Sequence, residues 1–328
     1  MRPEAPEDNS MRSEPILRVP VVDLDDYISC DTTGRVEIVD TIGDGLRELG
    51  FLVVEGHGID PALIRGSYEL WQSFFALDEA AKRQYSGVAG GARGFTPFGV
   101  EHAKDNPTPD LKEFWHVGQE LAPEDSARLG YAPNVWPQEV PGLREPTVAL
   151  FQALERVAEI LLRALAEYFD LPRDTFAAMM RQGNSILRVL HYPPVPAGAD
   201  PAVRAAAHED INLITLLCEA TDSGLQLLTR DGAWLPVEAH PGQIVVDAGD
   251  MLSRVTNEVV PATTHRVVNP AGGANRDRFS MPFFVHPYSA CDLTVNPRFV
   301  SRERPPKYPS ITAGAFLEER LAEIGLKK

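Results

Sequence analysis

The sequence predicts a mainly β protein with flanking helices, built around a β-barrel or a β-sandwich. After Asn184 the chain consists of short runs rich in β-branched and aromatic residues, and turn residues separate them at close intervals. Helical patterns do not alternate with these runs, as they would in a parallel sheet with crossover helices. A long amphipathic helix precedes them, and its apolar stripe is wide enough to cover one face of a sheet.

The first part of the chain combines strand and helix patterns. Apolar residues spaced by three and four predict a helix that ends at Gly50, while Asp60 and Pro61 supply an N-cap and a first-turn proline for a second helix. In chain order we expect a disordered tail (1–15), a strand (16–24), a helix (38–49), a buried strand (51–54) and a second helix (61–82).

Residues 87–141 contain frequent Gly and Pro and predict a long irregular segment. Such segments in compact proteins often act as lids or binding loops, so this one is a candidate for contact with a substrate. Lys112–His116 is the exception and predicts a strand at the edge of the site, in which Trp115 packs in the core. A long helix from Pro146 to Tyr168 and a short helix from Asp174 follow.

The strands expected after Asn184 follow one another through turns. Asp231-Gly232, Pro241-Gly242 and Gly272-Gly273 are typical turn sequences between them. We expect strands at residues 186–192, 213–217, 225–228, 233–237, 243–247, 267–268 and 279–285, and a closing amphipathic helix at 313–324.

Composition restricts the classes of partner and compartment. With 31 Lys and Arg against 47 Asp and Glu, the net charge of −16 argues against a nucleic-acid or anionic-membrane partner. The three cysteines, Cys30, Cys218 and Cys291, are odd in number and far apart, so we expect no disulfide framework and a reducing, cytoplasmic location. We find neither a signal-peptide pattern nor a membrane span. The sequence does not indicate the oligomeric state.

A His-x-Asp pair and one distant histidine supply candidate metal ligands. Successive side chains of an extended strand alternate, so His208 and Asp210 face one side while Glu209 faces the other. His265 also begins a β-type run and adds a second imidazole if the two strands face each other. Two imidazoles and one carboxylate on one face of a metal leave its opposite face open, as expected of a non-haem iron(II) oxygenase.

A candidate carboxylate site lies on the next strand. By the same period of two, Arg278 and Ser280 share one face. A guanidinium and a hydroxyl aimed together can bind a carboxylate, and Arg suits bidentate binding in a partly dry pocket better than Lys does. Together with the metal ligands, this pair suggests a chelating keto acid held between the two sites.

These motifs resemble those of the isopenicillin N synthase-like family of 2-oxoglutarate and iron(II)-dependent dioxygenases. The resemblance rests on His208-x-Asp210, on His265 in the segment HRVVNP, and on Arg278-x-Ser280. It extends to the amino-terminal half through residues 20–24 (PVVDL) and 50–59 (GFLVVEGHGI), and so covers most of the chain from about Pro20 to about Pro287.

The resemblance implies a double-stranded β-helix, or jelly-roll, core and the co-substrates 2-oxoglutarate and dioxygen. It assigns the iron(II) to His208, Asp210 and His265, the far carboxylate of 2-oxoglutarate to Arg278 and Ser280, and a further hydrogen bond to Tyr192. The corresponding division of the chain is a tail (1–15), an amino-terminal dioxygenase region (16–140), backing helices (141–182), the jelly-roll core (183–290) and a carboxy-terminal segment with a helix (291–328).

The function implied is an oxygenase that couples oxidative decarboxylation of 2-oxoglutarate to oxidation, with hydroxylation the commonest outcome, of a small molecule whose identity the sequence does not give. Two alternatives remain open at this point. One is an iron-dependent oxidase of the same family that does not use 2-oxoglutarate, since Arg278 and Ser280 can also hold a substrate carboxylate. The other is a non-catalytic barrel that binds a small carboxylate.

Polar residues near these motifs have structural interpretations. Asp247 and Asp250 flank Ala248-Gly249 and are expected to form a turn. Asn212 shares a face with Asp210 and is a candidate to support that ligand. His191, on an apolar strand, fits either a core histidine or the pocket wall.

Overall fold

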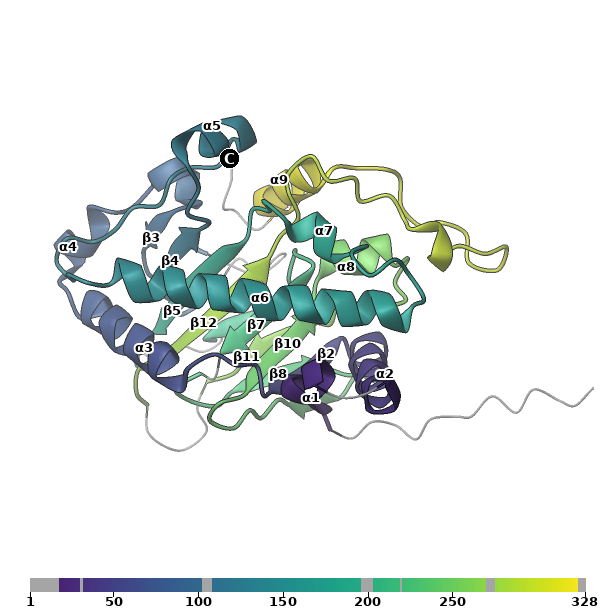
Figure 1. The fold of residues 1–328 in the computed structure, drawn as a ribbon. Coiled ribbons are helices and arrows are strands. Elements are labelled where there is room, and N and C mark those ends of the chain that lie inside the picture. The colour runs from purple at the N-terminus through teal and green to yellow at the C-terminus, as the bar shows by residue number, and fades with distance from the viewer. Residues whose placement is uncertain are drawn as a thin grey trace, which may run out of the picture.

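The protein, seen here in a computed structural model, is built on two β-sheets that face each other, with helices on the outside (Figure 1). The structure describes residues 18–29, 32–101, 108–195, 203–218, 220–269 and 275–323. This architecture confirms the predicted mainly β fold with a double-stranded β-helix core and flanking helices. The expected tail at 1–15 and the expected Gly272-Gly273 turn lie outside the described residues.

The larger sheet has eight strands in the order β1-β2-β10-β7-β12-β5-β4-β3. Every neighbouring pair is antiparallel except β1 with β2. The strands are β1 (Val21–Asp23), β2 (Phe51–Glu55), β3 (Gly94–Thr96), β4 (Glu113–Gly118), β5 (Ile186–Tyr192), β7 (Ile214–Cys218), β10 (Ile244–Ala248) and β12 (Arg278–Val285).

The smaller sheet has four antiparallel strands in the order β6-β11-β8-β9. They are β6 (Ala205–His208), β8 (Leu225–Leu228), β9 (Trp234–Pro236) and β11 (His265–Val267). Apolar side chains fill the space between the sheets at two places. Phe51 and Val245 of the larger sheet belong to one cluster with Leu227, and Tyr192 belongs to another with Val267.

Helices lie on the outside of the two sheets (Figure 1). They are α1 (Leu24–Ser29), α2 (Thr32–Glu48), α3 (Pro61–Phe75), α4 (Glu79–Arg83), α5 (Pro123–Leu129), α6 (Arg144–Tyr168), α7 (Ala177–Met180), α8 (Asp250–Val255) and α9 (Ala313–Glu323), with 3₁₀ turns η1 (Val88–Gly91) and η2 (Pro297–Phe299). No helix in these described stretches is long and apolar enough to cross a membrane.

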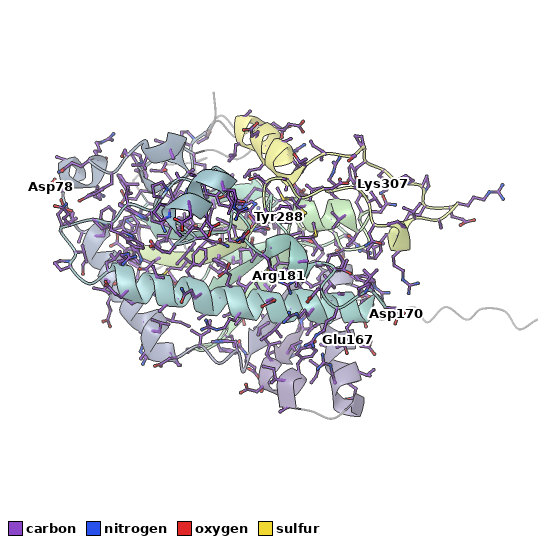
Figure 2. All side chains as sticks on the ribbon, turned by 45° about the horizontal axis from the view of Figure 1, so that its top comes forward. Asp78, Glu167, Asp170, Arg181, Tyr288 and Lys307 are labelled. Carbon is purple, nitrogen blue, oxygen red and sulfur yellow. The ribbon has the colours of Figure 1, made fainter. Side chains whose placement is uncertain are left out.

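Helix α6 runs across the larger sheet and packs against β7 and β12 (Figure 1). Its apolar stripe, which includes Leu154 and Leu161, belongs to the same core as Leu187 and Phe283 of the sheet. At its carboxyl end Glu167 points toward α1 and α2 (Figure 2), where it forms an ion pair with Arg35 at 2.8 Å. The outer face of the sheet is therefore fixed by helices, which leaves the inner face for a site.

The first half of the chain contains more regular structure than its sequence predicts. The second helix ends at Phe75 rather than near Lys82, because Asp78 caps a separate helix, α4, by accepting a hydrogen bond from the Ala81 amide at 2.8 Å. The segment 87–141 contains β3 and α5, both short, in addition to the predicted strand that becomes β4. Trp115 is fully buried, which confirms its assignment to the core.

Two helical glycines provide a test of how tightly α2 packs on α6. A Cβ on Gly43 of α2 would lie 2.1 Å from the ring of Tyr168, whereas a Cβ on Gly66 of α3 would meet nothing within 4 Å. We expect Gly66→Ala to stabilise the fold by about 0.5–1 kcal/mol, because alanine favours a helix. Gly43→Ala should destabilise it by about 1–3 kcal/mol through overpacking. Urea unfolding of both variants measures the difference, and equal effects would contradict the close contact.

Candidate metal centre

The two histidines predicted as metal ligands lie side by side on paired strands. His208 ends β6 and His265 begins β11, and the antiparallel register places them directly opposite each other. Their ring centroids are 4.4 Å apart. This pairing brings together two side chains that are far apart in the sequence.

Asp210, just beyond β6, completes a cluster of three possible donors. Its Oδ1 lies 3.8 Å from Nε2 of His208 and 3.9 Å from Nε2 of His265. One donor atom from each residue lies within 4.8 Å of the other two. Asp210 and His265 are buried, while the side chain of His208 is 33% exposed. Two nitrogens and one oxygen at this spacing fit a divalent metal ion such as iron(II).

The hydrogen bonds of both imidazoles suit metal binding. Nδ1 of His208 lies 2.8 Å from the Ala206 carbonyl, and Nδ1 of His265 lies 3.1 Å from the Thr263 carbonyl. A carbonyl only accepts, so each ring donates from Nδ1 and keeps the Nε2 lone pair free to bind a metal. Burial, helped by the neighbouring His208, lowers the pKa of His265 to about 4. That ring is therefore neutral at physiological pH.

Two polar residues of the chain orient Asp210. The Thr215 hydroxyl in β7 donates to Oδ2 of Asp210, and the Asn212 amide donates to the Thr215 hydroxyl at 2.8 Å. The carboxylate is thus held through one oxygen while the other faces the histidines. Asn212 supports Asp210 as its position predicted, although it does so through Thr215.

Asp247 also supports Asp210, which corrects the prediction that it forms a turn. It lies inside β10, where the register places it opposite Thr215 of β7. Burial raises the pKa of Asp247 well above its usual value, and the adjacent charge of Asp210 raises it further. The carboxyl group of Asp247 lies beside that of Asp210. The sequence does contain a sign of this position, because Asp247 directly continues the apolar run Ile244–Val246.

Asp250 does not form a simple turn either, because it lies in the first turn of α8. Its backbone amide donates to the Asp210 carbonyl at 2.7 Å, and so ties α8 to the segment that carries the candidate ligand. Burial and then the nearby Glu209 carboxylate raise the pKa of Asp250 to about 7.

The predicted carboxylate site lies at the start of β12. Arg278 is 1% exposed, and its register partner on β5 is Tyr192, whose ring centroid lies 4.9 Å from the guanidinium carbon. Nη1 of Arg278 donates to the Ser280 hydroxyl at 3.4 Å, and Nε donates to the Asp222 carbonyl at 3.1 Å. The structure therefore brings together all three predicted residues.

The carboxylate site and the metal cluster share the space between the sheets. Arg278, Ser280 and Phe284 lie on one face of β12, because side chains at intervals of two share a face. Phe284 is the register partner of Thr215, which holds Asp210. A ligand between the sheets can therefore face the guanidinium at one end and the metal ligands at the other.

A buried charged network lies beside this space. Arg188 of β5 donates to Nε2 of His116 at 2.7 Å and to Glu101 at 3.0 Å, and Lys112 lies 2.6 Å from Glu101. Burial alone would raise the pKa of Glu101, but Arg188 and Lys112 hold it well below its usual range. Each charge of the network is thus balanced by a neighbour.

His191 belongs to the opposite, outer face of β5. It contacts Glu113 at 2.7 Å and Asp277 at 2.6 Å, and its ring stacks on Phe279 with centroids 4.6 Å apart. The sequence left open whether His191 is a core histidine or part of the pocket wall. The structure supports a core histidine, because both ring nitrogens have partners on the side of the strand away from the pocket.

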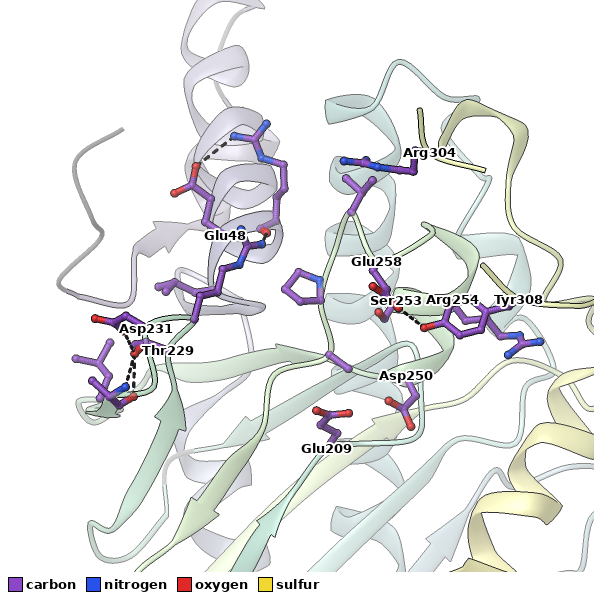
Figure 3. Close-up of a pocket in the computed structure, with 18 of the residues that line it drawn as sticks. Glu48, Glu209, Thr229, Asp231, Asp250, Ser253, Arg254, Glu258, Arg304 and Tyr308 are labelled. Carbon is purple, nitrogen blue, oxygen red and sulfur yellow. Dashed lines mark hydrogen bonds and ion pairs between the residues drawn. The ribbon is translucent and has the colours of Figure 1, made fainter. Parts of the chain in front are cut away.

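A cavity of about 1430 Å³ is lined by residues that follow β6 and β8 and by residues of α8, among others. Glu209 and Asp250 lie side by side in it (Figure 3). His208, Asp210 and His265 are not among the described residues that line it. Glu209 alternates with the candidate ligands along the strand, so this cavity faces away from the metal cluster.

Two family profiles match the chain. One is described as the amino-terminal part of a "non-haem dioxygenase in morphine synthesis" and matches residues 19–139. The other is described as "2OG-Fe(II) oxygenase superfamily" and matches residues 183–287, the part that carries the candidate metal ligands and the carboxylate site.

Curated and solved relatives agree with these profiles. A 2-oxoglutarate-Fe(II) type oxidoreductase of Aspergillus fumigatus is 29% identical over 92% of this chain and 91% of its own length. A crystal structure from Caulobacter crescentus, assigned to the 2OG-Fe(II) oxygenase family, is 43% identical, with a TM-score of 0.85 over 93% of this chain and 99% of that one.

A full-length Neurospora crassa protein, crystallised in complex with alpha-KG and thymine, is 27% identical, with a TM-score of 0.84 over 94% of this chain and 98% of that one. The matches extend over the greater part of each protein, and the site contains a donor set suited to iron(II). The chain therefore belongs to the 2OG-Fe(II) oxygenase superfamily, as an enzyme that uses iron(II), 2-oxoglutarate and dioxygen to oxidise a small molecule.

Proposed function

We propose that His208, Asp210 and His265 bind the iron(II), and that Arg278, assisted by Ser280 and Tyr192, binds the far carboxylate of 2-oxoglutarate. The observation that carries this proposal is the convergence of the three donor atoms within 4.8 Å of one another. The buried guanidinium of Arg278 in the same inter-sheet space supports the second part. A carboxylate there would satisfy a charge that is costly to bury alone.

The reaction we propose is hydroxylation of a C–H bond in a small organic substrate. Iron(II), when bound, activates dioxygen; one oxygen atom enters succinate as 2-oxoglutarate loses CO₂, and the other enters the hydroxylated product. The chain's own part is to present Nε2 of both imidazoles, to hold Asp210 through Thr215, and to fix the orientation of the keto acid through Arg278. The thymine complex of the similar Neurospora protein supports a substrate of small size.

Succinate formation tests the use of 2-oxoglutarate. We expect the iron-loaded protein to convert 2-oxoglutarate to succinate and CO₂ with uptake of dioxygen, slowly alone and faster with a suitable substrate from a screen of small molecules. Oxygen uptake without succinate would instead identify an oxidase that takes its electrons from the substrate.

The assignment of the iron ligands is tested by a pair of histidine variants. His208→Ala should lose tight iron(II) binding, because only two donors remain, whereas His240→Ala should bind as the unmodified protein does because its side chain is exposed. Anaerobic iron titration with a colorimetric chelator measures both. Full iron binding by His208→Ala would remove that residue from the site.

The role of Thr215 is tested by two substitutions of similar size. Thr215→Val removes the hydroxyl that orients Asp210, and we expect iron affinity to fall roughly 10- to 100-fold. Thr215→Ser keeps the hydroxyl and should bind iron nearly as well as the unmodified protein. The same iron titration applies, and equal loss in the two variants would show that the methyl group, rather than the hydrogen bond, matters.

The role of Arg278 is tested by separating iron binding from keto-acid binding. Arg278→Met should retain iron(II) but bind 2-oxoglutarate at least about 10-fold more weakly, because a charge-assisted hydrogen bond is lost. Anaerobic titration of the iron-loaded protein with 2-oxoglutarate, followed by its weak visible charge-transfer band, measures this. An unchanged titration curve would exclude Arg278 from the keto-acid site.

A further inference from the structure

A second buried guanidinium, that of Arg204, lies beside the proposed keto-acid site. Arg204 immediately precedes β6, and its backbone amide donates to Asn269 at 3.0 Å. The next residue, Ala205, packs in one apolar cluster with Tyr192 and Val267 between the sheets. From this position the side chain reaches the segment just before β12, where Nη2 donates to the Arg276 carbonyl at 2.7 Å. Its side chain is only 1% exposed.

The hydrogen-bonding capacity of Arg204 is largely unused. Nε and Nη1 are buried and have no hydrogen-bond partner among the described residues. The carboxylate of Asp222 lies 3.6 Å from Nη1, which is an ion-pair distance but too long for a good hydrogen bond. Asp222 is also shared, since Arg276 approaches its other oxygen at 3.4 Å. A buried guanidinium with unpaired N–H groups raises the free energy of the folded state unless an anion or another acceptor binds those groups.

Arg204 and Arg278 lie close enough to repel each other. The carbonyl of Asp222 accepts from Arg278, and the carboxylate of the same residue lies beside Arg204, so one residue contacts both guanidiniums. Burial lowers the pKa of Arg204, and the charge of Arg278 lowers it further. Tyr192 also lies near both cations. Two neighbouring buried cations with one partly shared carboxylate leave positive charge that an anionic ligand would neutralise.

We propose that Arg204 is a second guanidinium for the far carboxylate of 2-oxoglutarate, so that Arg278 and Arg204 hold this group together while Asp222 keeps the two side chains in place. This inference rests on the proposed role of Arg278. It makes Arg204 a binding residue that selects keto acids with a carboxylate at the far end. A keto acid without that carboxylate leaves both cations uncompensated and gains nothing from Arg204.

The test compares two keto acids in anaerobic titrations of the iron-loaded protein. The probes are 2-oxoglutarate and 2-oxobutyrate, which chelates a metal in the same way but lacks the far carboxylate. Arg204→Met should bind 2-oxoglutarate at least about 10-fold more weakly and 2-oxobutyrate within about 2-fold of the unmodified protein. The charge-transfer band and isothermal calorimetry both report the affinity, so no turnover is required.

Arg276→Met is the matched control. The Arg276 side chain approaches the same Asp222 carboxylate but is 63% exposed, so its removal tests whether an effect passes through Asp222 alone. We expect it to change 2-oxoglutarate affinity less than about 2-fold, as for an exposed ion pair. An effect as large as that of Arg204→Met would overturn direct contact by Arg204.

Other outcomes also decide the question. Equal weakening of both keto acids by Arg204→Met, or no weakening of either, would overturn the proposal. If Arg204→Met does not fold, as judged by thermal unfolding, Arg204→Lys replaces it: the shorter cation should weaken 2-oxoglutarate selectively, and equal effects on both acids overturn the inference. Failure of the unmodified protein to bind 2-oxoglutarate would instead overturn the proposed function.

Discussion

The candidate site depends on one pairing of strands, that of β6 with β11. Their antiparallel register places His208 opposite His265, and the two imidazoles then meet Asp210, which extends beyond the end of β6. A shift of one residue would turn one histidine to the other face of the sheet, where Glu209 now lies. The hydrogen bonds from Nδ1 to backbone carbonyls of the same segments then set the orientation of both rings. The fold thus supplies both the positions of the donors and the orientations of the two rings.

A second constraint is the cost of placing charges between two sheets. The outer face of the larger sheet is mostly apolar and packs against helices, whereas the inner face carries Asp247, Arg278 and the network of Arg188 with Glu101. Most of these groups are compensated by neighbours or by a shift of the pKa, as in Asp247, whose pKa is raised. Arg204 is less well compensated, because two nitrogens of its guanidinium group lack a hydrogen-bond partner among the described residues. A buried positive charge without a full set of partners therefore indicates a site at which an anionic ligand can bind.

Much of the fold followed from local sequence patterns. Alternating runs predicted the strands of the core, and the spacing of apolar residues predicted α2 and α6, because burial of one face dictates both patterns. The errors concentrate in short elements. α4, α5 and β3 are too short for a periodic signal and are fixed by a cap or by pairing with a neighbour, as Asp78 fixes α4. Asp247 was misassigned because an acid near glycine usually marks a turn, while here its neighbour Asp210 and its position in β10 decide its role.

By itself the sequence determined the fold class, the family resemblance and the residue types for a metal and a carboxylate, because side-chain alternation and motif spacing are local properties of the chain. Only the tertiary structure decided which distant residues meet. Strand register placed His265 against His208, aligned Asp247 with Thr215 and set Arg278 beside Tyr192. It also brought Arg204 to the start of β12, since the pairing of strands across two sheets is a long-range property that no local pattern contains.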